Sequence, residues 1–446
     1  MESNKIQGNP TKAFFIGMIT RDISIRDAII DLLDNSIDGA IQINPQNFSG
    51  LNIYLTINEN EFIVKDNCGG FSLETAQKYA FRFGRPEGAP ETIGSVGRFG
   101  VGMKRALFKI GQCFEVESKT TNDHFQINVD VENWKNKKKN IRDEEGIISE
   151  EDDWSFDYEN ITDASSDLIE NGTYIRVVKL NEDVSSIFKE QSFLNDLKND
   201  IERLLNFSIE KGIKIFLNGE PIEKKGIFLF KGLSTPYFYE FESNGVNVRI
   251  IAGLSSVGEP RSSGWYIYCN DRLVLEHDQT EITGWGVSLP QWHIDYVMFK
   301  GVVFMDSKET FKLPLTTTKK GIDATSDIYK KALYFMKEAM TSIFAFLKQV
   351  RKLEDANDYR KLLGDQETKV TVQMLKIDSF SVSRSFKSPD IDFDKIAIKQ
   401  DTVRISFNVP RETAELAKTH SNCKNYKEFG EYIYEYYLKM EEISHE

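Results

Sequence analysis

The sequence predicts an α+β protein of more than one domain. Its 446 residues exceed what one ordinary hydrophobic core accommodates, so two or three domains are expected, and a hydrophobic content of 40% suffices to fill them. Short runs with the alternation of strands stand beside longer runs with helical periodicity. Such a mixture is typical of α+β domains.

The composition narrows the classes of function. A formal net charge of −13 argues against nonspecific binding of nucleic acid by the whole surface, although it is compatible with a local basic patch. The four cysteines are far apart and form no CxxC pair, which disfavours a zinc site or a disulfide framework: Cys68, Cys113, Cys269 and Cys423. The N-terminal MESNKIQGNP has no apolar signal core, and no run approaches the ~18 apolar residues of a membrane span. We therefore expect a cytoplasmic protein without membrane contact.

The first helix is expected over residues 27–41, DAIIDLLDNSIDGAI. Its packing face consists, at helical spacing, of Ala28, Ile29, Leu32, Ser36 and Ala40. Asp31, Asn35 and Asp38 stack on another face and form a row of oxygen ligands. A solvated face is the plain alternative. Because short Asn and Asp side chains are poor helix formers, and apolar residues flank the row, we interpret it as a binding face.

A hairpin and two glycine-rich turns follow. The runs 51–57 and 61–66 predict two paired strands, and Gly69 and Gly70 after Asp66 let the backbone turn closely around a ligand. Residues 72–80 are predicted to be helical, and residues 81–100 to form a mobile loop.

The stretch GSVGRFGVGMKRALF leads from this loop into a helix. Gly97, Gly100 and Gly102 leave backbone N–H groups accessible next to the positive end of the helix, a combination that holds phosphate oxygens. Such a loop alone is weak evidence of function. It gains weight here from its order after the polar helix and the Asp66 turn.

The remaining elements follow from the same patterns. Strands are expected over 113–119, 124–131 and 172–179, and a solvated insertion with a basic and an acidic cluster over 135–153. A second α+β domain is expected from a helix at 187–206, strands at 213–217, 246–252, 264–269 and 300–306, and a long helix at about 324–350.

These motifs together resemble the GHKL superfamily, the ATPases grouped around gyrase, the heat-shock chaperone, histidine kinases and the mismatch-repair protein MutL. DLLDNSIDGA is similar to the N box, DNCGG to the adenine box, GRFGVGMK to the lid and phosphate box, and NGTYIRV (171–177) to the final Gly-Thr strand. The resemblance covers residues 1–180 and implies a Bergerat α/β sandwich that binds ATP and Mg²⁺.

The resemblance assigns roles by position. Asn35 would ligate Mg²⁺, and Asp31 would be the general base that activates water. The family usually has Glu at the place of Asp31, so hydrolysis is expected to be slow. Asp38 would support the metal or cap local hydrogen bonds, two alternatives of equal weight.

The nucleotide itself would be held by residues from three motifs. Asp66 would accept the adenine amino proton, Gly70 would make room for the ring, and Thr173 would add a hydroxyl. The phosphate box would comprise Gly97, Phe99, Gly100, Val101, Gly102, Met103 and Lys104. A lysine that opens a helix is often merely solvated, which is the alternative for Lys104.

The second half resembles the transducer domain of MORC and MutL-type proteins more weakly. GWYIYCNDRLVLEHD (264–278) is similar to its strand-turn-strand, and LPLTTTKKGID (313–323) to the loop that brings a lysine to the γ-phosphate. Lys319 would be that catalytic lysine, with Lys320 as the runner-up; two lysines in an exposed loop are the alternative. The resemblance implies an ATP-dependent homodimer whose domains move together.

The expected division is 1–185 (ATP-binding domain), 186–350 (transducer-like domain), 351–400 (charged helical or irregular linker) and 401–446 (strand-helix-helix module). The last part weakly resembles a ribbon-helix-helix module, with DNA binding, dimerisation or docking on the body as alternatives. Its helical stripe of Phe429, Ile433, Tyr436, Tyr437 and Met440 is expected to be core.

Three functions remain open at this point. They are a DNA-associated clamp or remodeler, possibly in bacterial defence, a chaperone-like or regulatory ATPase acting on protein clients, and a nucleotide-gated scaffold with little turnover. A histidine kinase is disfavoured because no phosphoacceptor histidine precedes residue 27.

Overall fold

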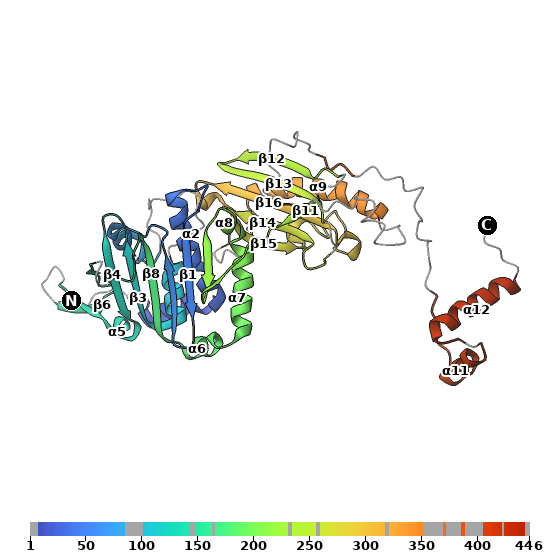
Figure 1. The fold of residues 1–446 in the computed structure, drawn as a ribbon, viewed down its shortest axis with the longest axis horizontal. Helices are drawn as coiled ribbons and strands as arrows, with labels where there is room; N and C mark the ends of the chain where they lie inside the picture. The colour runs from blue at the N-terminus through green and yellow to red at the C-terminus, as the bar shows by residue number, and fades with distance from the viewer. Residues whose placement is uncertain are drawn as a thin grey trace. The chain divides into compact units, whose positions relative to one another are not determined.

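The computed structural model describes residues 8–84, 101–142, 148–162, 166–230, 234–255, 259–316, 321–350, 369–371, 385–388, 405–421 and 423–441. The chain divides into two compact units, residues 1–396 and 397–446. The first unit contains two large sheets with their helices, and the second contains two short helices (Figure 1).

The first sheet has the strand order β10-β9-β1-β2-β8-β3-β4-β7. Its strands are β1 (Asn52–Ile57), β2 (Glu61–Asp66), β3 (Gly111–Lys119), β4 (His124–Asp130), β7 (Glu159–Asn160), β8 (Gly172–Leu180), β9 (Lys214–Leu217) and β10 (Glu220–Pro221). The predicted hairpin is confirmed, because β1 and β2 pair antiparallel with Ile53 opposite Asp66. The predicted strands near 113–119, 124–131 and 172–179 are confirmed as β3, β4 and β8.

Three helices, α1 (Lys12–Arg21), α2 (Ile25–Ile43) and α4 (Gly102–Ile110), share the core of this sheet. Ser24 begins α2, since its Oγ accepts a hydrogen bond from Asp27 N at 3.2 Å and donates to the Asp27 carboxylate. The expected helix over 72–80 consists of α3 (Leu73–Thr75) and the π-helix η1 (Ala76–Ala80). The described part of the expected insertion contains the end of α5 (Val131–Asn136) and a ribbon of β5 (Lys138–Arg142) and β6 (Ile148–Asp152).

The first sheet extends beyond the boundary expected at residue 185. β9 pairs parallel with β1, with Asn52 opposite Lys214, so the strand predicted at 213–217 does not belong to the second sheet. After β8 the chain continues through α6 (Glu182–Phe188), α7 (Gln191–Leu204) and α8 (Asn206–Glu210). These helices bring it back to the edge of β1, where β9 pairs. These three helices replace the single helix predicted over 187–206.

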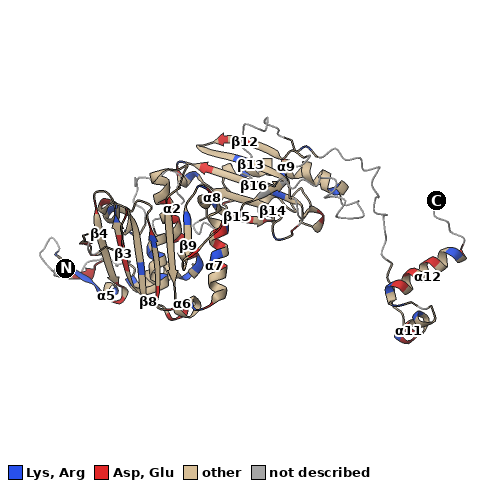
Figure 2. Cartoon of the chain, viewed as in Figure 1, with Lys and Arg blue, Asp and Glu red and all other residues tan. Residues whose placement is uncertain are grey.

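Charged residues of both signs lie along α7 (Figure 2). Two of its carboxylates, those of Asp196 and Asp200, pair with Arg26 of α2 at 3.3 and 3.2 Å. Through these pairs α7 is tied to the start of the helix that carries the predicted binding face.

The second sheet has the order β12-β13-β16-β14-β15. Its strands are β12 (Tyr237–Ser243), β13 (Val246–Leu254), β14 (Gly264–Cys269), β15 (Arg272–Asp278) and β16 (Phe299–Ser307). The predicted strand-turn-strand is confirmed by the antiparallel pair β14–β15, whose turn residues Asn270 and Asp271 have φ of 46° and 62°. The long helix α9 (Asp327–Val350) packs on one face, while Phe207 of α8 packs on the other against Tyr268 and Phe304.

Short elements complete the first unit. They are the two-stranded sheet of β11 (Phe228–Phe230) and β17 (Lys369–Thr371) and the 3-10 helices η3 (Glu281–Thr283), η4 (Ile294–Tyr296) and η5 (Thr310–Lys312). Most of the linker expected over 351–400 lies outside the described residues. Among the described helices, none combines the length and the apolar character that crossing a membrane requires.

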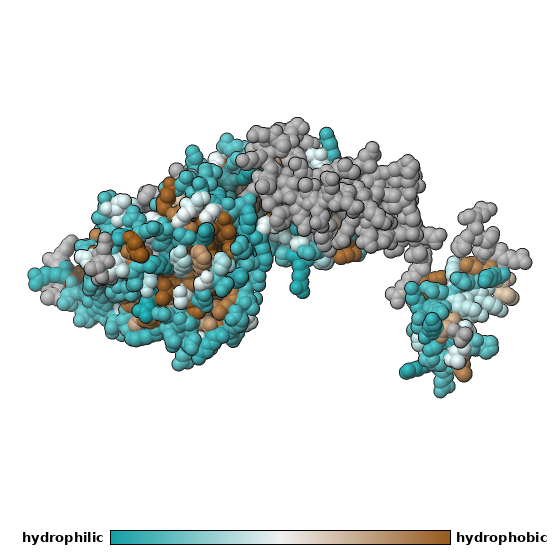
Figure 3. All heavy atoms as spheres, viewed as in Figure 1, coloured by the Kyte–Doolittle hydropathy of each residue, from teal (hydrophilic) through white to brown (hydrophobic). Residues whose placement is uncertain are grey.

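The second unit contains α11 (Arg411–His420) and α12 (Tyr426–Met440). The strand predicted before them is not formed over 405–410, where no described segment pairs with the chain; a strand requires a hydrogen-bonded neighbour, and alternation alone does not supply one. The prediction that the α12 stripe is core is also wrong. Ile433, Tyr436, Tyr437 and Met440 are exposed, and apolar side chains lie on the surface of this unit (Figure 3).

Candidate functional site

Helix α2 carries the predicted polar row. Asp31, Asn35 and Asp38 follow one another along it, but their environments differ: Asp31 is buried, Asn35 is exposed and Asp38 is half-buried. Asn35 therefore presents its amide to solvent, where a ligand can reach it. Its amide oxygen is a hard donor of the kind that Mg²⁺ prefers, so the residue present at this position fits the ion.

The carboxylate of Asp31 is paired with a residue that the sequence analysis did not single out. Arg105 Nη2 of α4 donates to Asp31 Oδ2 at 2.5 Å, and both side chains are largely removed from solvent. The same oxygen lies 3.5 Å from the position that a Cβ on Gly102 would occupy. Asp31 thus lies against the first turn of the helix that follows the predicted phosphate loop. The sequence placed Arg105 in that helix, but it contained no signal for a contact between helices.

Asp66 is the polar centre where α2, β2 and β8 meet. Its Oδ2 accepts a hydrogen bond from Ser36 Oγ at 2.6 Å, and its Oδ1 accepts from Cys68 N at 2.9 Å and Thr173 N at 3.2 Å. Burial raises the pKa of the Asp66 carboxyl, and the hydrogen bonds oppose that shift. The structure therefore holds this carboxylate through three hydrogen bonds, and it brings Asp66 next to the backbone of Thr173, whose predicted hydroxyl contact stays a prediction.

The glycines around Asp66 are required by close packing. Gly70 has φ of +64°, and a Cβ there would lie 2.4 Å from Lys119 O and 2.7 Å from Gly172 O. The space at Gly70 is thus filled by strand backbone, which gives this glycine a reason other than the expected room for an adenine ring. Likewise, a Cβ on Gly39 would lie 2.5 Å from Cys68 O, so α2 approaches the turn after β2 only because this helix position is glycine.

The start of α4 is the described part of the predicted phosphate loop. Arg105 N donates to Val101 O at 2.9 Å, so the N–H groups of the first turn, at Gly102, Met103 and Lys104, are not used by helical hydrogen bonds. This geometry suits an anion at the helix N-terminus. Gly97, Phe99 and Gly100 lie outside the described residues.

The Lys104 side chain is buried against the segment that precedes the loop. Its Nζ donates to Ala80 O at 2.5 Å and lies 5.7 Å from the centre of the Phe83 ring. Burial lowers the pKa of Lys104 to about 7. Ala80 is the last residue of η1, so this contact joins α4 to η1.

A second unforeseen contact joins α2 to the second sheet. Arg272 Nη1 at the start of β15 lies 3.8 Å from Asp34 Oδ1, and both side chains are buried. Asp34 is next to Asn35 in the sequence, so this pair connects the predicted metal-binding helix with the predicted transducer. The two residues are far apart in the sequence, and the motif comparison assigned no function to either of them.

The loop that would carry Lys319 is described only at its base. Leu315 pairs with Ile322, and Thr316 N donates to Gly321 O at 3.1 Å, so the ends of the loop are held together. Lys319 and Lys320 themselves lie outside the described residues.

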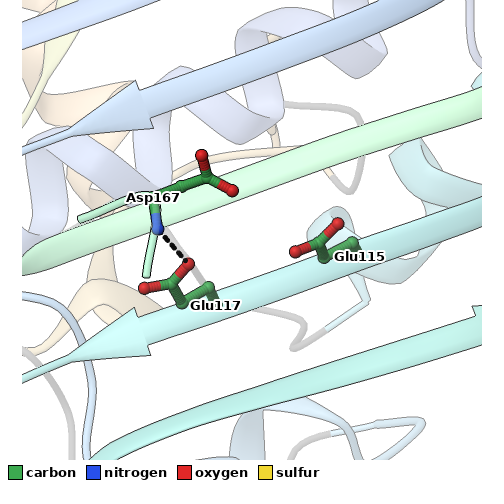
Figure 4. A group of neighbouring side chains, drawn as sticks. All are labelled: Glu115, Glu117 and Asp167. Atoms are coloured by element: carbon green, nitrogen blue, oxygen red, sulfur yellow. Dashed lines mark hydrogen bonds between the residues drawn. The ribbon is translucent and has the colours of Figure 1, made fainter. Parts of the chain in front are cut away.

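One acidic cluster lies elsewhere. Glu115, Glu117 and Asp167 offer carboxylate oxygens within 4.8 Å of one another (Figure 4). Glu117 accepts hydrogen bonds from Ser166 Oγ and, at 3.1 Å, from Asp167 N, and it contacts His124 Nε2 at 2.9 Å. Because Glu115 and Glu117 alternate with core residues of β3, they lie on the sheet face opposite α2 and α4. The carboxylates of Glu115 and Glu117 have protein partners, and the cluster is not part of the α2 site.

Part of the chain matches a known protein family. Residues 23–166 match the family described as Histidine kinase-, DNA gyrase B-, and HSP90-like ATPase. The matched stretch includes α2, the β1–β2 hairpin and α4, and it ends before Thr173 and the second sheet. No curated protein matches the chain.

Proposed function

Residues 23–166 match the GHKL-type ATPase domain, and from that match we propose that the chain is a Mg²⁺-dependent ATPase whose nucleotide cycle changes its conformation. The observation that carries the proposal is that α2 holds Asp31 against the N-terminus of α4 and, through Ser36, also contacts Asp66. Asn35 lies on the same helix between Asp31 and Ser36. A metal-binding amide, a buried carboxylate and an anion-binding helix end are the groups that a nucleotide site requires.

Adenine recognition is proposed for Asp66 and Thr173. Asp66 is held by Ser36, Cys68 and Thr173, so its position does not depend on the ligand. A carboxylate oxygen fixed in this way accepts the hydrogen bond of an exocyclic amino group without reorganisation.

Phosphate binding and hydrolysis are proposed for α2 and α4. The first-turn N–H groups of α4, with Val101, Gly102 and Met103, would hold phosphate oxygens. Bound Mg²⁺, held through the side-chain oxygen of Asn35 and with Asp38 near it, would offset phosphate charge. Asp31 would take the proton of the attacking water, whose oxygen bonds to the γ-phosphorus as the bond to the β-phosphate oxygen breaks.

A conformational role is supported by the contacts between the two sheets. Arg272 of β15 is paired with Asp34 of α2, and Arg203 of α7 is paired with Glu276 of β15. A movement of α2 on nucleotide binding would therefore act directly on the second sheet. Lys319, on the loop before α9, is proposed to reach the γ-phosphate and to reinforce this link. ATP-dependent homodimerisation is part of the proposal.

The client is proposed from the resemblance of β14–β15 and the following loop to MORC and MutL transducers. This resemblance favours a DNA-associated clamp or remodeler, with bacterial defence as one role, over an ATPase that acts on protein clients. A nucleotide-gated scaffold with little turnover is the second candidate, and the pairing of Asp31 with Arg105 favours it, since a carboxylate paired with a cation is a poor base.

One assay separates these functions. ATP turnover is measured for the full chain alone, with duplex DNA, and with an unfolded protein, and Asp31→Asn serves as the matched control for contaminating ATPases. Stimulation by DNA supports the clamp, and stimulation by unfolded protein supports the chaperone-like role. ATP binding without turnover above that of Asp31→Asn in any condition supports the scaffold. Failure to bind MgATP in calorimetry would refute the proposed function itself.

A further inference from the structure

We propose that Arg105 is an ATP-sensing residue that pairs with Asp31 when no triphosphate is bound and moves to the terminal phosphate when ATP binds. The proposal rests on the proposed function and deepens it, because it names how the same site distinguishes ATP from ADP. It also gives a reason for the pairing of the predicted base with a cation.

The position of Arg105 places it within reach of both partners. It is the fourth residue of α4, and its side chain pairs with Asp31. Asp31 in turn lies against Gly102, at the helix end proposed to hold phosphate. A long, flexible arginine side chain that starts one turn inside this helix needs only a change of side-chain rotamer to exchange a carboxylate for a phosphate.

The guanidinium has unused donor capacity in the described structure. Arg105 Nε is buried and makes no hydrogen bond within the part of the chain that the structure describes. A guanidinium offers five N–H donors in a fork that matches two oxygens of one phosphate, whereas the Asp31 pair is formed through a single Nη2–Oδ2 contact. A phosphate group would therefore satisfy more of the donors of Arg105 than Asp31 does.

The difference in charge between the two partners favours movement of Arg105 from Asp31 to the terminal phosphate. The terminal phosphate of ATP has more negative charge and more acceptor oxygens than one carboxylate, and it would lie beside the same helix end. ADP has no γ-phosphate, so it offers Arg105 no equivalent partner at that position. Arg105 would then make a contact with ATP that it cannot make with ADP, and this contact would distinguish the two nucleotides.

The decisive experiment compares two variants that both lack the Asp31 carboxylate, so that Arg105 cannot act through it. ATP and ADP affinities are measured by calorimetry for Asp31→Asn and for Asp31→Asn/Arg105→Ala, each in the full chain. If Arg105 binds the terminal phosphate, the added Arg105→Ala change lowers ATP affinity about tenfold or more and changes ADP affinity less than about twofold. If Arg105 only neutralises or holds Asp31, the ratio of ATP to ADP affinity is the same in both variants, and the proposal is overturned.

Two further variants keep the test interpretable. Lys109→Ala in the Asp31→Asn background removes a positive charge from the last turn of the same helix, and it should leave the ATP to ADP ratio unchanged. Arg105→Gln replaces Arg105→Ala if the alanine variant does not fold, because it keeps most of the side-chain volume and loses the charge. An equal change of the ratio in Lys109→Ala would mean that general electrostatics, and not Arg105 itself, distinguishes the nucleotides.

Measurements of ATP turnover test the movement of Arg105 in a chain that keeps Asp31. At saturating ATP, Arg105→Ala should lower turnover, because the positive charge at the developing phosphate charge is lost. A rise in turnover would mean that Arg105 stays on Asp31 in the ATP-bound protein and restrains it, which contradicts the exchange. A wild-type chain that binds no ATP refutes the proposed function, whereas one that binds ATP with a ratio indifferent to Arg105 refutes this inference alone.

Discussion

The buried pair of Arg272 and Asp34 gives the sharpest stability prediction. The two charged atoms lie 3.8 Å apart, and the side chains are 8% and 3% exposed. At that distance an effective dielectric constant of about 20 gives about 4 kcal/mol of attraction, most of which offsets the cost of removing both charges from water. Removing one partner leaves the other charge buried, so Arg272→Met should reduce the free energy of unfolding by about 3 kcal/mol.

A double-mutant cycle in urea measures the coupling between the two residues. Arg272→Met, Asp34→Asn and the double variant should yield a coupling energy of roughly 1–3 kcal/mol, since the double variant contains neither charge of the pair. The matched control is the pair of Arg176 and Glu61 on the first sheet, which is closer at 2.8 Å but 45% and 26% exposed. Its coupling should stay below about 1 kcal/mol. Additivity within about 0.5 kcal/mol at Arg272 and Asp34 would refute the reasoning that burial makes this contact strong.

Four other predictions concern the proposed nucleotide site. Asn35→Ala should reduce Mg²⁺-dependent ATP affinity about tenfold or more, because phosphate charge is then poorly neutralised; unchanged affinity in calorimetry would remove Asn35 from the site. Asp31→Asn should keep ATP binding but lose about 10²-fold or more in turnover, and wild-type turnover would show that Asp31 is not the base. Lys319→Ala should impair turnover and ATP-driven dimerisation in sedimentation more than it impairs binding, while the control Lys320→Ala should do little; the opposite pattern would place the sensor at Lys320. Lys104 has a pKa lowered to about 7, so the unfolded chain binds more protons above that pH and stability should rise with pH. From about pH 7 to pH 9 the rise should be roughly 2 kcal/mol, and urea titrations should show no such rise in Lys104→Met if the buried amine causes it.

Local patterns in the sequence were sufficient for much of the first domain. The helix of Asp31, Asn35 and Asp38, the hairpin that ends at Asp66, and the helix after the glycine loop all form where periodicity and turn residues predicted them. Each depends on neighbours within a few residues: a capping serine, alternating apolar positions, or glycines at a turn. The order of these motifs was also enough to predict the family that residues 23–166 match.

Contacts between distant segments were decided only by the tertiary structure. The parallel pairing of β9 with β1 moved a strand from the second domain to the first sheet, because an open strand edge accepts any strand that the chain brings to it. Over the described residues 405–410, the strand expected before α11 did not form, since no described segment pairs with them. Gly70 and Gly39 were explained by carbonyl oxygens of other segments that occupy the space of a side chain.

The charged contacts of α2 show the physical reason for this division. The sequence determined that α2 presents carboxylates and an amide at helical spacing, because that spacing is a property of the helix alone. It did not determine that Arg105 pairs with Asp31 or that Arg272 pairs with Asp34. Many arginines in the chain have the charge for such a pair, and only packing selects the one whose guanidinium is buried beside a given carboxylate. The sequence by itself therefore determined which polar side chains α2 presents for the proposed nucleotide site. The tertiary structure decided which arginines pair with its carboxylates.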